Sequence, residues 1–445
     1  MNYIFRKNYS IIINRIIFNQ KIILLFFLLL YGICYINNFN NIKNNIIRIG
    51  IIAQSLKNGG CERQTSLILK YFNKINKFQL FLFTKKDKDE NEYIIGKEIK
   101  RIILKDNLIN QLKNENIDIL LYQFYDYNEI KNLFKIKKMN VIIINRSCFL
   151  HWIYYNNYKM FQTYYKTIKN ATYIISLIPF ENDYLFKKWG INSILMNNFL
   201  SYEYNSITPS NLSSKMILMI GRGNDYIKRF DLGIKAMKYI VDKIPECTMK
   251  IVSSNNNIDY LKDIVKELNL SKYIEFVGYT SKPEKFFKKA SLHLFPTLVE
   301  SFGNVLTETL SYGIPNILVG LDYVSASNKG GTIIIYDDSP ISLANIAIKV
   351  LLNNTYLKTL GKEARNSIKQ FKNDLLLKRW AKLIISIYKG TDYYKKLINQ
   401  DTKINSKDSK KIIENQLNLL RKRKKDFLNI SINDIENFTF MENLK

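Results

Sequence analysis

The chain has 445 residues, more than one ordinary hydrophobic core accommodates, so we expect two domains and additional segments. Apolar residues make up 47% of it and charged residues 24%, which excludes a wholly disordered protein. The formal net charge of +29 raises the question of nucleic-acid binding, but lysine and asparagine are enriched along the whole chain. A nucleic-acid footprint would be a local basic patch, so we attribute the bias to codon composition and expect no nucleic-acid partner.

The four cysteines lie far apart in the sequence, at Cys34, Cys61, Cys148 and Cys247. They form no CxxC pair and have no histidine at metal-ligand spacing, so the sequence predicts neither a disulfide framework nor a zinc site. A DxD match at 87–89 lies in the charged stretch KKDKDENE, which we interpret as solvated surface.

Residues 22–36 read IILLFFLLLYGICYI, an uncharged apolar stretch that follows a flank with basic residues and no acid. As a helix of about 1.5 Å per residue the stretch is roughly 22 Å long, shorter than the ~30 Å hydrocarbon core of a bilayer. A retained signal anchor and a cleaved signal peptide are the two interpretations. The bulky Tyr31, Tyr35 and Ile36 make a poor cleavage site, which favours a transmembrane helix that is kept.

Basic residues concentrate on the cytosolic side of membrane segments. The flank before residue 22 carries more of them than the residues just after 36, where Lys43 and Arg48 follow. We therefore expect a cytosolic N-terminus and a body across the membrane, in the lumen of the ER or Golgi if the cell is eukaryotic. A body on the cytosolic face is the alternative.

Beyond an Asn-rich linker, apolar stretches of strand length alternate with amphipathic stretches of helix length. In the first half the predicted strands are 48–53, 78–84, 101–104, 117–121, 141–145 and 172–177, with a helix at 62–72. In the second half they are 216–220, 247–252, 273–277, 292–295, 315–319 and 332–335, with helices at 230–242, 258–268 and 341–352. This alternation is typical of parallel sheets covered by helices on both faces.

A Ser- and Asn-rich stretch at 201–214 interrupts the alternation and is the best candidate for a domain boundary. The fold class we predict is α/β, with two doubly wound, Rossmann-like domains facing a central cleft. The predicted segments are a cytosolic basic N-terminus (1–21), a transmembrane signal anchor (22–36), a linker (37–47), a first domain (48–200), a second linker (201–214), a second domain (215–390) and a basic tail, helical or disordered (391–445).

Glycine is scarce in this chain, so its clusters are informative. Gly59 and Gly60 follow a predicted strand in QSLKNGGCERQTSL and open a predicted helix. Without Cβ atoms they let a ligand approach backbone N–H groups at the positive end of the helix dipole. A turn that merely requires positive φ is the alternative.

A second cluster, GRGNDYIK at 221–228, also follows a predicted strand. Arg222 lies at the carboxyl end of that strand and Lys228 just before the next helix, so both can reach one pocket. A diphosphate requires two cations that stay charged, and Arg supplies a planar fork and Lys a point charge. An ordinary basic loop is the alternative.

A third motif, LVESFGNVLTE at 298–308, places Glu300 in a loop and Glu308 more than one turn into a helix, where its side chain leans toward the helix N-terminus. The two carboxylates can then bracket a sugar nucleotide. Backbone N–H groups near Gly303 and Asn304 can face its phosphates. A salt bridge on the helix face is the alternative for the two glutamates.

In this order and spacing the motifs resemble the retaining glycosyltransferases of family 4, which have the two-domain GT-B fold. The resemblance covers about 48–390 and is clearest at 221–365. GGCER at 59–63 is similar to the family's GG-x-E-R loop, and YGIPNI at 312–317 to its G-x-P strand entry. The resemblance implies transfer of a sugar from a nucleoside diphosphate to a glycan, lipid or protein-linked acceptor, with no metal and no cofactor.

The resemblance also implies roles for matched positions. Arg222 and Lys228 match the pair that holds the donor diphosphate. Glu300 matches the first Glu of E-x7-E, which contacts the donor sugar, and Glu308 matches the second, which holds the ribose hydroxyls. The other expected donor contacts are Gly303, Asn304, Gly59 and Gly60.

One position departs from the family pattern. Many relatives have a histidine after the strand at 141–145, near the reacting carbon, and here Arg146 stands there in NRSCFLHW. We therefore predict Arg146 as the catalytic-site residue of the first domain. His151 could take the place of that histidine, although a structural role fits it better, and we expect His293 to be a core residue.

The sequence thus predicts a membrane-anchored, retaining hexosyltransferase. Arg222 and Lys228 would stabilise the charge on the departing nucleoside diphosphate, and domain closure would exclude water. A nucleotide-sugar epimerase on the same fold is the second interpretation as an enzyme. A catalytically inactive, membrane-tethered sugar-binding or scaffold protein is the alternative from another class.

Overall fold

The computed structural model describes residues 46–57, 59–104, 107–154, 158–254, 256–327, 330–401 and 409–421. The predicted anchor at 22–36 lies outside these stretches, as do the basic N-terminus and the end of the tail. Contacts divide the chain into two compact units, one of Met1–Ile47 with Asn76–Gln79 and one of Arg48–Ile75 with Leu80–Lys445. Among the helices that the structure describes, none is long and apolar enough to cross a bilayer.

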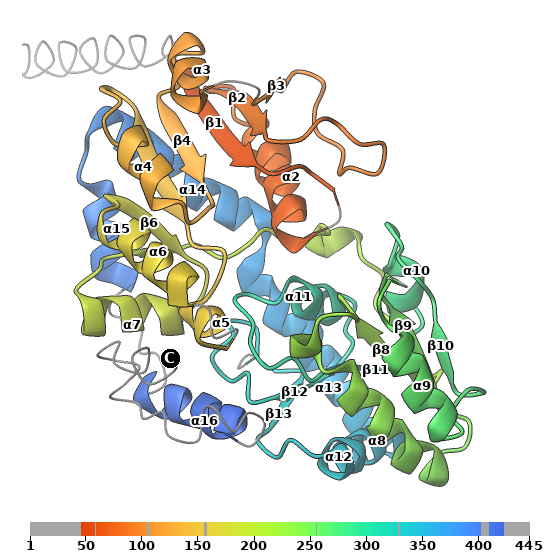
Figure 1. The fold of residues 1–445 in the computed structure, drawn as a ribbon. Coiled ribbons are helices and arrows are strands. Elements are labelled where there is room, and N and C mark those ends of the chain that lie inside the picture. The colour runs from red at the N-terminus through yellow and green to blue at the C-terminus, as the bar shows by residue number, and fades with distance from the viewer. Residues whose placement is uncertain are drawn as a thin grey trace, which may run out of the picture. The chain divides into compact units, whose positions relative to one another are not determined.

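The first sheet has seven strands in the order β3-β2-β1-β4-β5-β6-β7 (Figure 1). These strands are β1 (Ile47–Ala53), β2 (Phe78–Thr84), β3 (Lys100–Ile103), β4 (Ile119–Tyr122), β5 (Asn140–Ile144), β6 (Tyr173–Ser176) and β7 (Ile194–Leu195). Pairing is parallel from β1 through β4, β5 and β6 to β7, and from β2 to β3. The strands predicted in this half of the chain are confirmed, and β7 is an addition that is too short to show a periodic pattern.

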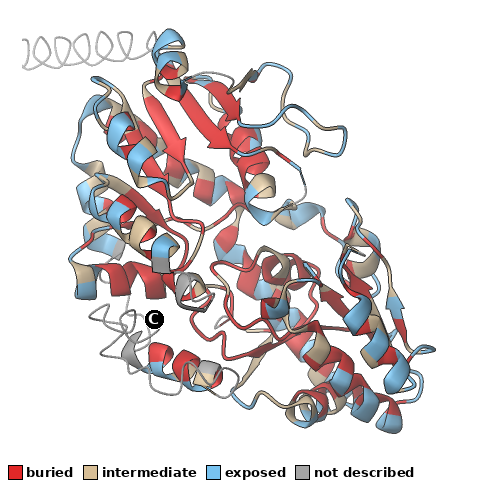
Figure 2. Cartoon of the chain, in the orientation of Figure 1, coloured by how far each residue is buried: buried red, intermediate tan, exposed pale blue. Residues whose placement is uncertain are grey.

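The central strands are continuous apolar runs, because helices cover both faces of a parallel sheet. Every residue of β4, which reads ILLY, is buried. Figure 2 shows buried positions along these strands and exposed positions on the outer faces of the helices. The helices between the strands are α2 (Gly60–Phe72), α3 (Leu108–Asn114), α4 (Tyr127–Leu133), α5 (Phe149–Tyr154), α6 (Tyr158–Lys169) and α7 (Pro179–Trp189).

The second sheet has six strands in the order β10-β9-β8-β11-β12-β13, all paired in parallel. They are β8 (Met216–Ile220), β9 (Thr248–Val252), β10 (Ile274–Phe276), β11 (Leu292–Phe295), β12 (Asn316–Val319) and β13 (Thr332–Ile335). Their helices are α8 (Phe230–Lys243), α9 (Asp259–Glu267), α10 (Glu284–Phe287), α11 (Asn304–Ser311), α12 (Pro340–Leu352) and α13 (Asn354–Ser367). Short 3₁₀ turns occur at η1 (Tyr204–Ser206), η2 (Tyr226–Lys228) and η3 (Ile368–Phe371). The six predicted strands and three predicted helices of this half are confirmed.

Two helices after η3 pack against elements of the first sheet rather than the second. Helix α14 (Asn373–Lys389) packs on α2, where the rings of Phe72 and Trp380 meet edge to face at 5.6 Å, and α15 (Tyr393–Asp401) packs on β7. The predicted second domain at 215–390 includes α14, yet this helix covers elements of the first sheet. The chain therefore crosses back after η3.

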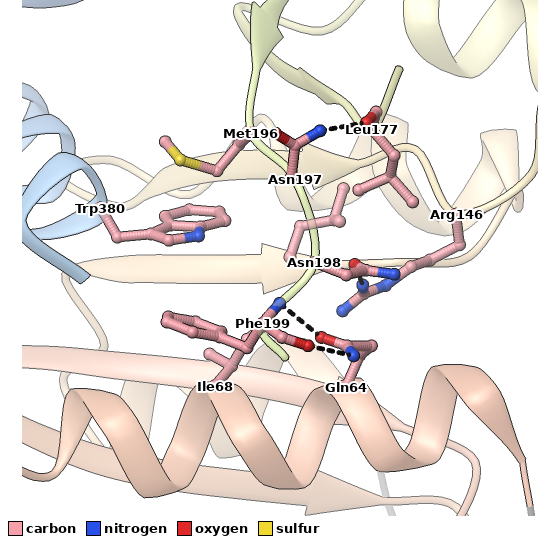
Figure 3. Close-up of a pocket in the computed structure, with 10 residues that line it drawn as sticks. Gln64, Ile68, Arg146, Leu177, Met196, Asn197, Asn198, Phe199 and Trp380 are labelled. Atoms are coloured by element: carbon pink, nitrogen blue, oxygen red, sulfur yellow. Dashed lines mark hydrogen bonds between the residues drawn. The ribbon is translucent and has the colours of Figure 1, made fainter. Parts of the chain in front are cut away.

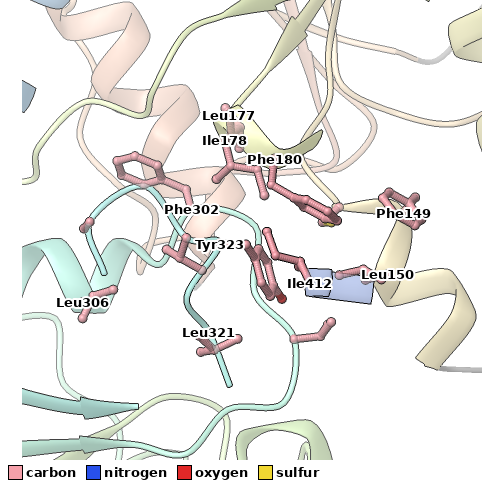
Figure 4. Close-up of a cluster of buried hydrophobic side chains, with 14 of the residues drawn as sticks. Phe149, Leu150, Leu177, Ile178, Phe180, Phe302, Leu306, Leu321, Tyr323 and Ile412 are labelled. Carbon is pink, nitrogen blue, oxygen red and sulfur yellow. The ribbon is translucent and has the colours of Figure 1, made fainter. Parts of the chain in front are cut away.

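Helix α16 (Ser409–Arg421) lies in the basic tail that we predicted to be helical or disordered. Its Ile412, Ile413 and Leu417 are buried in an apolar cluster that also contains Phe149 and Tyr323. Figure 4 shows Ile412 beside Tyr323, with Phe149 and Leu150 on the other side. The helical alternative is therefore confirmed for 409–421, and this helix is not simply a solvated basic run because one of its sides carries apolar side chains that pack. Residues 422–425, which complete the basic run RKRKK at 421–425, lie outside the described residues.

Candidate functional site

The loop after β8 carries the predicted cation pair. Asp225 organises this loop, because its carboxylate accepts a bond from the backbone N–H of Ile227 at 3.2 Å and one from Arg222 Nη2 at 2.9 Å. The Arg222 side chain is 74% exposed, and Lys228 ends the 3₁₀ turn η2. One short loop therefore presents both cations at the carboxyl end of β8.

Lys228 does not point into solvent. Its Nζ donates to Glu300 Oε2 at 3.0 Å, and this partly buried pair joins the loop after β8 to the loop after β11. Burial raises the pKa of Glu300, but Lys228, the His151 ring and the Ser301 N–H stabilise the carboxylate and leave the pKa below its ordinary value. Glu300 is therefore an anion at neutral pH, next to a cation that a phosphate could share.

Helix α11 begins directly after this loop. Gly303 precedes it with φ 76° and ψ 67°, a left-handed conformation that costs other residues about 1–2 kcal/mol. Gly303 has no side chain that could cap the helix, which leaves the first-turn N–H groups open to a ligand at the positive end of the dipole. The predicted position of Gly303 and Asn304 at a helix start is confirmed.

Asn304, the first residue of α11, contacts the other sheet's elements. Its Oδ1 accepts bonds from Gln64 Nε2 at 3.3 Å and Asn198 Nδ2 at 3.0 Å, and its Nδ2 donates to the Gly60 carbonyl at 3.4 Å. A Cβ on Gly60 would lie 3.1 Å from Asn304 Nδ2. The start of α2 thus lies against the start of α11, and Gly60 permits that approach.

Gly59 and Gly60 do not adopt a positive-φ turn. Gly59 has φ −165°, which is extended backbone, and Gly60 begins α2. The alternative that we gave for this pair, a turn that requires positive φ, is therefore wrong. The Glu62 side chain occupies the place where a Cβ on Gly59 would lie. The absence of a side chain at Gly59 therefore makes room for Glu62.

Arg146 follows β5 and is buried, with 9% of its surface exposed. Its Nε donates to Gln123 Oε1 at 3.0 Å and its Nη1 to Asn198 Oδ1 at 2.8 Å, whereas Nη2 has no partner among the described residues. Burial lowers the pKa of this guanidinium. Figure 3 shows Arg146 turned toward Asn198 at a small cavity with a volume of about 10 Å³, room for about one water molecule.

His151 lies on α5, five residues after Arg146 in the sequence. Burial lowers the pKa of His151 to about 4, with Glu300 acting against this shift and Lys228 adding to it. Its Nδ1 has no hydrogen-bond partner in the described part of the chain. The neighbouring backbone N–H of Cys148 donates to Ser301 Oγ at 2.8 Å, which fixes this segment against the Glu300 loop. His151, which we interpreted as structural, is thus within electrostatic reach of the predicted donor residues.

The other histidine behaves as predicted. His293 is fully buried in β11, and its Nδ1 lies 2.5 Å from Asn316 Oδ1 on the adjacent strand β12. It is a core residue.

Glu308 is 3% exposed and already paired. Its Oε1 forms an ion pair with Arg63 Nη1 at 2.9 Å and accepts a hydrogen bond from Ser201 Oγ at 2.5 Å. The alternative of a salt bridge is therefore confirmed for Glu308, and its partner Arg63 comes from helix α2. Sequence reasoning included Arg63 in the GGCER motif but gave it no role, and only the three-dimensional arrangement brings it to Glu308.

No cluster of His, Cys, Asp or Glu within the described stretches could hold a metal ion. The interpretation of 87–89 as solvated surface is confirmed, since Asp87 and Lys88 are exposed and Asp89 makes an exposed ion pair, its Oδ2 lying 2.6 Å from Lys57 Nζ.

Residues 203–367 match the family model described as Glycosyl transferases group 1. The poly(glycerol-phosphate) alpha-glucosyltransferase of Bacillus subtilis is 28% identical over 130 residues, which cover 29% of this chain and 18% of that protein. The chain spans less than half the length of the curated relatives it matches.

Solved structures are similar over most of the chain. Sucrose-phosphate synthase from Thermosynechococcus elongatus has a TM-score of 0.66 at 16% identity and covers 78% of this chain and 100% of its own. The Anabaena protein HepE, solved in complex with UDP and glucose, has a TM-score of 0.60 at 14% identity and covers 76% and 100%. At these identities the likeness shows the fold alone, the GT-B arrangement of two parallel-sheet α/β domains.

Proposed function

We propose that this protein is a glycosyltransferase that takes its sugar from a nucleoside-diphosphate donor. The observation that carries the proposal is the cluster of Arg222, Lys228 and Glu300 after β8 and β11, inside the segment that matches the group 1 model. Ligands of open parallel sheets bind at the carboxyl ends of the strands, where these residues lie.

The chemistry follows from the charges. As the bond between the sugar carbon and the diphosphate breaks, negative charge grows on the leaving group, and the acceptor oxygen forms the new bond. Arg222 is exposed enough to turn from Asp225 to a phosphate, and Lys228 can share its charge between Glu300 and that phosphate. Cations aimed at developing charge supply the largest usual share of such catalysis.

The finer proposal is transfer with retention at the sugar carbon, without a metal or other cofactor. The resemblance to family 4 supports it, and so does the name of the Bacillus subtilis relative, an alpha-glucosyltransferase. In this proposal Glu300 contacts the sugar, Glu308 the ribose, and Gly303, Asn304, Gly59 and Gly60 the phosphates. Arg146 then faces the reacting region from the first domain, with a glycan, lipid or protein-linked acceptor beside it.

We further propose that residues 22–36 anchor the protein to a membrane, with a cytosolic N-terminus and the body in the ER or Golgi lumen of a eukaryotic cell, or on the cytosolic face as the alternative. The apolar run and its basic flank support this. Carbonate extraction tests the anchor: the full chain should stay in the membrane pellet and a variant without 22–36 should not. Release of the full chain would contradict it.

The experiment for the activity is turnover by the full-length protein in detergent against a panel of UDP-, GDP- and ADP-sugars, with pooled glycan and lipid acceptors. Release of nucleoside diphosphate from one donor, with the sugar found on an acceptor, is the expected result. Glu300→Gln, which removes a charge and keeps the side-chain volume, should lose roughly ten- to a hundredfold in rate, as for the loss of one hydrogen bond to a charged group.

The same assay separates the alternatives. An epimerase would return an altered sugar nucleotide, or free diphosphate and sugar, without a labelled acceptor. A sugar-binding or scaffold protein would bind a donor and turn none over. Either result, with a protein whose thermal unfolding shows that it is folded, would replace the proposed function.

A further inference from the structure

Glu308 has one oxygen occupied and one open. Both of its partners lie at Oε1, where Arg63 Nη1 forms an ion pair at 2.9 Å and Ser201 Oγ donates a hydrogen bond at 2.5 Å. No described residue bonds to Oε2, although the side chain as a whole is 3% exposed. A carboxylate has about four lone-pair sites, so this one keeps the capacity to accept hydroxyl groups.

The guanidinium that holds Oε1 is itself fixed on three sides. Arg63 Nη2 donates to the Tyr202 hydroxyl at 3.4 Å, and the Arg63 carbon Cζ lies 5.6 Å from the Tyr202 ring centre and 6.0 Å from that of Tyr93. Such cation–aromatic contacts orient a planar guanidinium. The contacts with Tyr202 and Tyr93 thus hold the guanidinium in place, so that one carboxylate oxygen of Glu308 faces Arg63 and the other faces away.

We propose that Arg63 is a positioning residue for nucleotide recognition: by holding Oε1 of Glu308 it directs Oε2 to the hydroxyls of the donor ribose. This inference rests on the proposed function, in which Glu308 receives the ribose. It adds that the ribose site is completed by a residue of α2, which belongs to the first sheet, while Glu308 belongs to α11 of the second. Ribose recognition then depends on elements of both sheets.

The alternative is that Arg63 only ties α2 to α11. The two roles differ in what they do to nucleotides without ribose hydroxyls. A positioning residue affects only a ligand that bonds to Glu308, whereas a structural tie affects every nucleotide equally. A hydrogen bond to a charged group contributes about ten- to a hundredfold in affinity, enough to measure.

The test is calorimetric binding to the full-length protein in detergent. UDP, GDP and ADP identify the base that binds tightest, and its 2′,3′-dideoxy analogue is then compared with the ribonucleotide. The variants are Arg63→Ala, Arg63→Lys, Glu308→Gln and the double variant of Arg63→Ala with Glu308→Gln. Lys70→Ala, an exposed cation on the same helix, is the matched control.

The wild type and the Lys70→Ala variant should prefer the ribonucleotide by about tenfold or more. Arg63→Ala should bind the ribonucleotide more weakly and the dideoxy analogue unchanged, so that the preference is lost, as in Glu308→Gln. Arg63→Lys should keep part of the preference for the ribonucleotide. Its ammonium supplies the charge but lacks the second nitrogen that donates to the Tyr202 hydroxyl. The double variant should lose no more preference than either single one.

Two results would overturn the inference. If Arg63→Ala weakens both nucleotides by the same factor, or leaves the preference intact, Arg63 is a structural tie only. If the double variant loses more preference than Glu308→Gln alone, Arg63 contacts the ribose independently. Absence of binding by UDP, GDP and ADP to folded wild-type protein would instead contradict the proposed function itself, and the inference with it.

Discussion

At the scale of single residues, Lys228 and Glu300 form an ion pair in the proposed donor site. Each neutralises the other at 3.0 Å, so neither charge is left uncompensated in a partly buried place. A phosphate would enter beside the lysine without requiring the glutamate to change its ionisation. Arg222 differs, because its exposed side chain can be removed with little effect on folding.

Glu181 is a buried carboxyl that the proposed chemistry does not use. Its Oε1 accepts the backbone N–H of Phe149 and the Tyr164 hydroxyl, both at 3.1 Å, next to the segment that carries Arg146 and His151. Burial raises the pKa of Glu181 to about 8, although these bonds act in the opposite direction. The group therefore takes up a proton on folding between its unfolded pKa of about 4.3 and about 8.

Stability should consequently fall as pH rises across that window, because the folded state binds the proton that the unfolded state releases. Glu181→Gln has no proton to lose. The melting temperature of the variant minus that of the wild type should therefore be larger at pH 8 than at pH 5.5, by a few degrees. Glu267→Gln, at an exposed position, serves as control. An equal difference at the two pH values would show that Glu181 is not protonated in the folded protein.

At the scale of elements, the strands and helices could be predicted because their patterns are local. Runs such as MILMI in β8 are apolar throughout, and β8 and β11 both end where glycine-bearing motifs begin. The β7 strand gave no signal, since two residues cannot show a period. The packing of helix α16 was not predicted, because the many lysines of the tail obscure the helical spacing of its buried apolar residues.

Gly303→Ala should lower stability and activity together. Its φ of 76° costs alanine about 1–2 kcal/mol, and the new Cβ would lie 3.2 Å from Leu306 Cβ at the start of α11. Gly190→Ala is a matched control, because Gly190 ends α7 with φ 63° and nothing lies within 4 Å of a Cβ there. Denaturant unfolding should show a loss in both variants, and turnover should fall only in Gly303→Ala. Normal turnover in both would remove Gly303 from the site.

The packing of α16 makes a second prediction at this scale. Ile413 is fully buried in the cluster with Phe149 and Tyr323, so Ile413→Ala should destabilise the protein by about 2–5 kcal/mol. Its neighbour Glu414 is exposed, and Glu414→Ala should change stability by no more than about 0.5 kcal/mol. Urea unfolding of the two variants measures both. Equal stability would mean that α16 is not docked in solution.

At the scale of the whole molecule, the motifs could not predict which residues of the two sheets meet. Arg222 and Lys228 lie in the loop after β8 and Glu300 in the loop after the adjacent strand β11, which explains why Lys228 contacts Glu300 at 3.0 Å. The contacts of Gln64 with Asn304 and of Arg63 with Glu308 join separate sheets, and the first pair is 240 residues apart in sequence. Motif spacing cannot predict contacts between residues so far apart in the chain. The sequence therefore predicted a role for Glu308 but not its contact with Arg63.

The most direct measurement of the central claim is the turnover number of Arg222→Ala with the donor that the wild type uses. Arg222 is 74% exposed and paired at i,i+3, and Lys266 has the same exposure and an i,i+3 partner away from the site. If Arg222 stabilises the departing diphosphate, Arg222→Ala should lose roughly 10²–10³ in kcat with unchanged thermal stability, and Lys266→Ala should lose nothing. Equal turnover by the wild type and both variants would contradict the claim that this loop holds the leaving group.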